Sequence, residues 1–294
     1  MRTPRLRLLS AILAVALFFT LLPVSALAEG GGSTGVSHVA TRSLNTDNKD
    51  DQGLTYTLHA DHTATVASYD DSAPGGVIDI PDTVISGGQP YPVTAIGVYA
   101  FNPSRTTTKV SSVFIPATVT SIGRFAFRCC KFLATVTFAE GSQLKSIGVS
   151  AFSGTTPAHP IFTQIQIPAS VETIGTNAFH NCQDLESITL PASLKPIESS
   201  AFSYCRNLSE INLPTSLTTI EISVFDGCSS LETVFYDGSL AQWSQINTSN
   251  GFLGDSSPSL VMNDYTAQFI SVKDENDPYP PPKTVTITKY TGTE

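Results

Sequence analysis

The chain contains the stretch Leu185-Glu186-Ser187-Ile188-Thr189-Leu190-Pro191-Ala192-Ser193-Leu194-Lys195-Pro196-Ile197-Glu198-Ser199-Ser200-Ala201-Phe202-Ser203-Tyr204-Cys205, and residues 208–228 repeat its pattern. A phrase close to Ile-Gly-x-x-Ala-Phe occurs six times, from Ile96 to Phe225, and its Ile returns after 26, 25, 27, 23 and 23 residues. Units at such a spacing form a solenoid, in which each unit buries its apolar side chains against the next. The stacked core is therefore predicted to include Ile122, Phe127, Ile147, Phe152, Ile174, Phe179, Ile197, Phe202, Ile220 and Phe225.

Each unit also contains a stretch in which apolar and polar residues alternate, as in Ser187-Ile188-Thr189. This alternation predicts a short, half-buried strand. A proline such as Pro191 ends four of these strands, because proline cannot donate a hydrogen bond to a ladder. We therefore expect an α/β but β-dominated leucine-rich-repeat solenoid. It should be right-handed, with a parallel sheet on one face and short turns or helical turns on the other.

The repeats closely resemble the BspA-like class of bacterial leucine-rich repeats, whose pattern is roughly LxxIxLPxxLxxIGxxAFxxC. Residues 185–205 and 208–228 match it almost without a break, and the resemblance covers about residues 93–236. It implies a curved solenoid in a secreted or surface protein, often one linked to adhesion or to binding of host proteins. Glu198 and Glu221 depart from the pattern, since they stand where the class has glycine.

The two ends of the chain differ from the repeats in composition. Basic residues, an apolar run and Ala26-Leu27-Ala28 predict a secretory signal, and an uncleaved anchor is the alternative reading. The only tryptophan, Trp243, is expected to cover the last repeat. The predicted domains are a signal peptide (1–28), a flexible polar linker (29–52), an N-terminal β cap (53–92), about six repeats (93–236), a C-terminal cap (237–265), and a linker with the possible start of a further domain (266–294).

Charge narrows the range of partners. Without its first 28 residues the chain keeps 16 − 3 = 13 basic and 25 acidic side chains, a net charge of −12. Such a chain repels phosphate, so nucleic acid is not an expected partner. No apolar run after the signal has the roughly 20 residues that span a bilayer. The expected product is a monomer at the cell surface or outside the cell.

The sequence contains no recognisable catalytic motif, and we expect no enzyme activity, no cofactor and no metal. Cys130, Cys182, Cys205 and Cys228 share one repeat position, which predicts a buried column of small side chains. A disulfide from Cys205 to Cys182 or Cys228 remains an alternative in an exported protein. The five histidines show no metal-ligand spacing.

The side of each strand that faces outward supplies the candidate ligand-binding surface. Insertions before Val113 and Ile165 and near Glu140–Ser142 predict an irregular loop edge beside it, although neutral loop variation explains them equally. We expect an adhesin-like protein that recognises an extracellular protein or glycan; a passive spacer or a non-catalytic arm of a larger secreted protein is the alternative. The candidate ligand-binding residues are Phe114, Thr137, Gln164, Gln166, Thr189, Glu210, Asn212 and Phe235.

Overall fold

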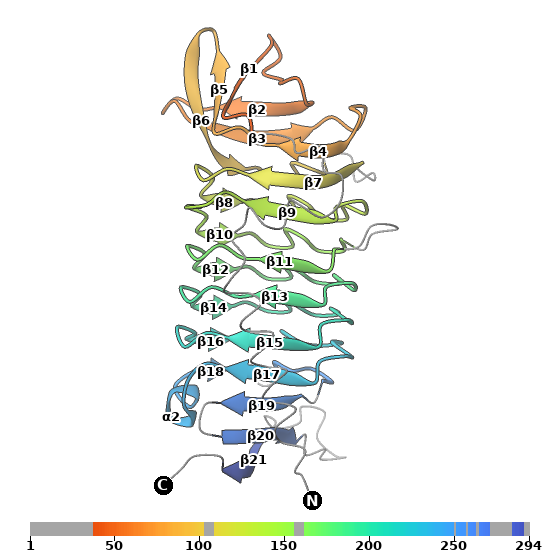
Figure 1. Ribbon diagram of the computed structural model, residues 1–294, viewed down its shortest axis with the longest axis vertical. Coiled ribbons are helices and arrows are strands. Elements are labelled where there is room, and N and C mark those ends of the chain that lie inside the picture. The colour runs from red at the N-terminus through yellow and green to blue at the C-terminus, as the bar shows by residue number, and fades with distance from the viewer. Residues whose placement is uncertain are drawn as a thin grey trace, which may run out of the picture. The chain divides into compact units, whose positions relative to one another are not determined.

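A computed structural model describes residues 38–102, 109–155, 162–249, 251–256 and 258–262, together with the backbone of 265–270 and 284–290. The predicted signal peptide lies outside these residues. From Val39 onward the chain forms one unit, which coils into a β-solenoid (Figure 1). The longer strands pair in parallel along what we call the strand face. They are β4 (Gly76–Asp79), β7 (Val110–Ile115), β9 (Thr135–Phe138), β11 (Gln164–Gln166), β13 (Ser187–Thr189), β15 (Glu210–Leu213), β17 (Thr233–Tyr236) and β19 (Ser259–Met262).

The Ile phrase forms a second parallel sheet, which corrects the prediction of a sheet on one face only. The backbone carbonyl of each Ile accepts a hydrogen bond from the turn after it. For example, Gly123 N donates to Ile96 O at 2.7 Å, and Gly148 N donates to Ile122 O at 2.8 Å. We call this sheet the isoleucine ladder. Its strands are β6 (Gln89–Ile96), β8 (Ser121–Ile122), β10 (Ser146–Ile147), β12 (Thr173–Ile174), β14 (Pro196–Ile197), β16 (Thr219–Ile220) and β18 (Asn247–Thr248).

The turn around each Ala-Phe pair is not helical, which corrects the α/β part of the prediction. Each turn contains a left-handed residue just before the Ala and, where described, a second one two residues after the Phe, as at Ser200 and Tyr204 around Phe202. Left-handed residues interrupt an α-helix, and the turns close through short bonds such as Ala201 N to Glu198 O at 3.2 Å. In the described part of the chain the helix is α2 (Leu240–Trp243).

The glycine of the Ile-Gly phrase is required by the close approach of neighbouring turns. A Cβ placed on Gly123 would lie 2.8 Å from the carbonyl carbon of Gly97, and one on Gly148 would lie 2.8 Å from that of Gly123. Real Cβ atoms do not approach backbone so closely. The glycines therefore set the tight spacing of the first turns.

The core is a column of stacked aromatic rings. All six repeat phenylalanines are at most 1% exposed, and the rings of neighbouring turns lie 4.6 to 5.9 Å apart with interplanar angles of 16° or less. Tyr69 continues the column at its start, 6.0 Å from Phe101. At the other end, Leu253 is buried at the equivalent position of the next turn. The ten predicted core residues are therefore all buried in one stack.

The N-terminal end contains β2 (Leu54–Leu58) and β3 (Ala64–Tyr69), which pair as an antiparallel hairpin with His62 in its turn. β5 (Thr83–Ser86) pairs antiparallel with β6. Residues 38–52 were predicted to belong to a flexible linker, but they are ordered. β1 (Thr41–Ser43) pairs in parallel with β5 and covers the open edge of that sheet.

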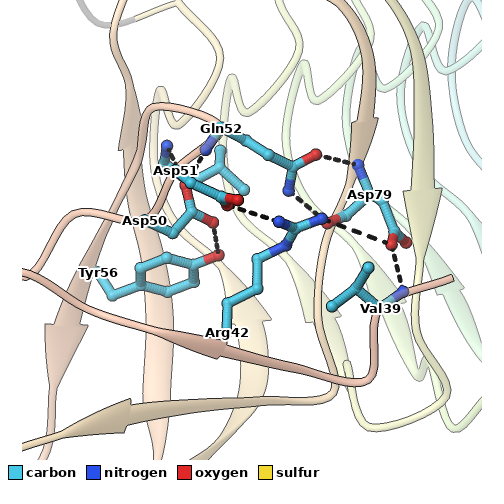
Figure 2. A network of polar contacts seen from close by, with 8 residues as sticks. Val39, Arg42, Asp50, Asp51, Gln52, Tyr56 and Asp79 are labelled. Carbon is cyan, nitrogen blue, oxygen red and sulfur yellow. Dashed lines mark hydrogen bonds and ion pairs between the residues drawn. The ribbon is translucent and has the colours of Figure 1, made fainter.

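A network of polar contacts holds β1 in place (Figure 2). Arg42 Nη1 lies 2.5 Å from Asp51 Oδ1, and Arg42 Nη2 lies 3.8 Å from Asp79 Oδ2. Gln52 exchanges two hydrogen bonds with the backbone of Asp79, at 2.6 and 2.9 Å. Asp50 accepts from Tyr56 Oη at 2.9 Å. Asp79 is far in sequence from both Arg42 and Gln52, which explains why composition alone suggested a linker.

The C-terminal end adds another turn to the stack. β18 and β19 extend the two ladders, and Trp243 is 7% exposed, with its ring 5.2 Å from Tyr236. β20 (Tyr265–Ile270) pairs antiparallel with β19, and β21 (Thr284–Tyr290) pairs antiparallel with β20. The segment predicted as a linker from residue 266 thus begins with a strand of the same sheet, while residues 271–283 lie outside the described part. None of the described helices is long and apolar enough to cross a membrane.

Candidate functional site

The predicted ligand-binding residues form two columns on the strand face. In the column that contains Gln164 and Glu210, Gln164 pairs with Ser187 and Glu210 pairs with Thr233. The second column is also in register wherever strands pair: Phe114 with Thr137, Gln166 with Thr189, and Asn212 with Phe235. Parallel neighbours lie about 4.8 Å apart, so each column is a row of side chains on one face.

Exposure separates the polar members of these columns from the aromatic ones. The exposed members are Thr137, Gln164, Gln166, Thr189, Glu210 and Asn212. Phe114 and Phe235 are only half-buried, not exposed as predicted. Their neighbours Asp79 and Val261, on β4 and β19, extend the sheet past them. The two phenylalanines therefore offer less free apolar surface than the sequence suggested.

The strand face is interrupted between β9 and β11 and again between β13 and β15, where the strands do not pair, and a groove of about 310 Å³ opens at the first of these breaks. Thr137 and Gln166 lie on opposite sides of it. The lining is uncharged; its side chains come from Val136, Thr137, Phe138, Ala139, Ser142, Gln166, Ile167, Pro168, Ala169 and Ser170. The groove thus combines amide and hydroxyl groups with apolar walls, a composition typical of small-ligand sites.

The two-residue insertion after β9 forms one wall of this groove. β9 ends in Phe138-Ala139 without the proline that follows its neighbours, and Gly141 and Ser142 of the insertion line the groove. The insertion is ordered by its own bonds, such as Ser142 N to Ala139 O at 3.2 Å. Sequence reasoning missed Phe138 and Ser170 as lining residues, although the missing proline and the altered spacing were a detectable signal.

The cysteine column is buried, and all five cysteines are free thiols. Each column thiol donates to the carbonyl of the Phe in the preceding turn, for example Cys205 Sγ to Phe179 O at 3.2 Å and Cys228 Sγ to Phe202 O at 3.1 Å. Burial raises the pKa of Cys182 and of Cys228 to about 12 and raises that of Cys205 as well. Thiols held protonated in this way are poor nucleophiles and poor metal ligands.

The two glutamates that replace glycine have structural partners. Glu198 Oε2 accepts from the backbone N and the Oγ1 of Thr176, both at 2.9 Å. Glu221 Oε2 accepts from Ser199 N at 2.9 Å and from Ser199 Oγ at 2.6 Å. Each carboxylate therefore satisfies a backbone donor of the turn before it, and neither points to an acid-base site.

The histidines also have local partners. His59 Nε2 lies 2.8 Å from Thr65 Oγ1, and the His62 ring lies 5.7 Å from that of Tyr91. His180 packs edge-on against Tyr204, and burial lowers the pKa of its imidazole. Within the residues that the structure describes, no group of three His, Cys, Asp or Glu side chains could hold a metal ion.

Comparison with known proteins assigns the repeats to a family. The family model described as "BspA type Leucine rich repeat region" matches six copies, over residues 89–161 and 158–250. These ranges cover more than half of the chain. The chain belongs to this family. No curated protein matches this chain.

Several solved structures of leucine-rich proteins are similar to this chain. A T. pallidum leucine-rich-repeat protein aligns with 68% of this chain and 85% of its own, with 25% identity and a TM-score of 0.55. A leucine-rich cell surface protein from Faecalibacterium prausnitzii aligns over 68% of this chain and 72% of its own, with 22% identity and a TM-score of 0.40. A Bacteroides ovatus leucine-rich-repeat protein aligns over 67% and 66%, with 26% identity and a TM-score of 0.40.

Proposed function

We propose that this BspA-type protein is a non-catalytic binding protein, exported from the cell, that recognises an extracellular protein or glycan with its strand face. The observation that carries the proposal is the combination of exposed polar columns with the groove between β9 and β11. Export is proposed from the basic, apolar and small-residue pattern of residues 1–28.

The chemistry of the surface supports a ligand recognised by hydrogen bonds. Gln166, Thr189 and Asn212 present amide and hydroxyl groups, which donate and accept but carry no charge. Because the strands are packed on a core of stacked rings, the backbone that carries these groups is held in place, and little backbone ordering opposes binding. A rigid row of neutral polar groups suits the hydroxyls of a glycan or the backbone of a protein segment.

The test is a triple substitution of Gln166, Thr189 and Asn212 by Glu. A ligand identified on an array of glycans and extracellular proteins should bind the purified protein in biolayer interferometry, and the triple variant should weaken this binding at least tenfold. Three carboxylates would have to be desolvated at the interface without partners. A tenfold loss corresponds to about 1.4 kcal/mol.

The matched control places the same added charge elsewhere. Thr120, Thr218 and Gln245 are exposed and lie outside the strand face, so their triple Glu variant should bind like the wild type. The control variant should keep the wild-type thermal midpoint, because isolated surface changes cost little. The strand-face variant should lose a little thermal stability and still unfold cooperatively, because positions 166 and 189 lie opposite each other and like charges there repel. Equal binding by both variants, or no ligand on the array, would favour a passive spacer.

A further inference from the structure

A second candidate surface lies along the edge of the solenoid that is formed by the turns around the Ala-Phe pairs. Each of these turns comes before a strand of the strand face. The position two residues before the Phe is left-handed in every turn, with φ between 52° and 58° at Ser150, Asn177, Ser200 and Ser223. In the first two turns the same position holds aromatic residues instead, Tyr99 at φ 57° and Phe125 at φ 59°.

Aromatic residues are unusual in this backbone conformation. The left-handed region is disfavoured for L-residues, and asparagine tolerates it better than bulky side chains do. The packing of the core does not demand these rings, because the four later turns make the same bend with Ser or Asn. An unfavourable residue that the fold does not need is a reason to look for a role in binding.

Two guanidinium groups are held against one of these rings. The Arg124 Cζ lies 4.4 Å from the centroid of the Phe125 ring, and the Arg128 Cζ lies 5.1 Å from it. The Tyr99 ring stacks on Phe125 at 4.8 Å. The arginine backbones are fixed too, since Arg124 O accepts from Tyr99 N at 3.1 Å and Arg128 O accepts from Asn102 Nδ2 at 2.5 Å.

Both guanidinium groups are free to bind an anion. Arg124 and Arg128 are exposed, and in the described residues neither forms an ion pair. A guanidinium above a ring leaves the N–H donors along its edge available, and their planar arrangement suits a carboxylate. Because Phe125 holds two of them in place, less side-chain freedom is lost on binding.

We propose that Val98, Tyr99, Arg124, Phe125 and Arg128 form a binding site for an acidic polypeptide segment that carries an apolar side chain. The carboxylates of the segment bind the two arginines, and its apolar side chain covers Val98, which is 57% exposed. Charge complementarity identifies the acidic partner, since these arginines are a local basic feature on a chain of net charge −9. The exposed valine favours a polypeptide, because an apolar side chain covers more apolar surface there than a sugar ring does.

The experiment measures fluorescence anisotropy of labelled peptides with the full-length protein. One probe alternates Glu with Leu, and the reference probe of the same length alternates Lys with Leu. The acidic probe should bind, the basic probe should not, and binding should weaken as salt is raised, because exposed charges are screened. The double variant Arg124→Gln/Arg128→Gln should lose at least tenfold in affinity for the acidic probe.

Two further variants separate this site from net charge and from folding. Lys195→Gln/Arg206→Gln removes the same charge from two exposed residues outside the site and should bind normally. Phe125→Asn removes the ring that stacks on Tyr99 but places a residue that suits the left-handed backbone, so the variant should still fold cooperatively while binding weakens. The proposal is overturned if the Lys195/Arg206 variant loses affinity equally, if Phe125→Asn binds like the wild type, or if the protein binds heparin but not the acidic peptide.

Discussion

Replacing Phe179 by Ala tests the stacked core at its centre. The side chain is fully buried, and its ring stacks at 5.2 Å on Phe152 and at 5.6 Å on Phe202. Truncating a buried phenylalanine costs about 3–5 kcal/mol, because transfer free energy is lost and a cavity remains. Both neighbouring rings are held by their own turns and cannot fill the gap, so we expect the upper half of this range.

The position in the column gives a second, internal comparison. Phe225 has a phenylalanine neighbour on one side, Phe202 at 5.9 Å, while Leu253 takes the ring position of the next turn. One aromatic pair contributes about 0.5–1.5 kcal/mol beyond burial. Phe225→Ala should therefore destabilise less than Phe179→Ala by about that amount.

The assay is urea unfolding followed both by far-ultraviolet circular dichroism and by the fluorescence of the single Trp243. The first signal reports the whole stack and the second reports its C-terminal end, so coincident transitions justify a two-state free energy. Phe132→Ala serves as the control, because this ring is 38% exposed. A loss below about 1 kcal/mol for Phe179→Ala, with an unchanged urea slope, would refute the stacking argument.

Three further predictions concern polar and titratable groups. Cys182 and Cys228, whose thiol pKa is about 12, should react with a disulfide reagent only as fast as the protein unfolds. Glu198→Ala should lower the free energy of unfolding by about 1–2 kcal/mol in urea titrations, because the backbone N–H of Thr176 loses a charged acceptor at a half-buried site. Burial raises the pKa of Asp50 above its unfolded value, so the folded state binds a proton more readily. The contribution of this residue to stability is then greatest at low pH and falls as pH rises from about 3.9 through the folded pKa, and Asp50→Asn should flatten that slope.

Each of these three predictions has an outcome that would contradict it. Thiol modification much faster than unfolding would show that the column is accessible in the folded state. Glu198→Gln keeps an acceptor for Thr176, so it should recover most of the stability that Glu198→Ala loses. If Glu198→Gln is as unstable as Glu198→Ala, the negative charge of Glu198, and not the hydrogen bond, accounts for the stabilisation. For Asp50, a wild-type pH slope no steeper than that of the Asn variant would show that its burial has no energetic effect.

The repeat pattern determined the core of this protein. Residues such as Ile122 and Phe179 recur at fixed positions, and a stacked chain can bury such residues in only one way, so the solenoid and its inward side chains were predictable. The strand-face columns followed from the same periodicity, because alternate residues of a strand point to opposite faces. Even Glu198, which breaks the pattern, kept the fold and only changed the hydrogen bonds.

Only the tertiary structure decided how neighbouring turns meet. The second parallel sheet at Ile96 and Ile122, and the left-handed residues that replace helical turns, depend on backbone bonds to the next turn, which one unit's sequence does not encode. The same holds for the groove beside Gln166 and for Arg42, whose partners Asp51 and Asp79 come together only when β1 docks. Short-range periodicity fixes which side chains face inward, whereas gaps, caps and surface clusters arise from contacts between residues that are distant in sequence.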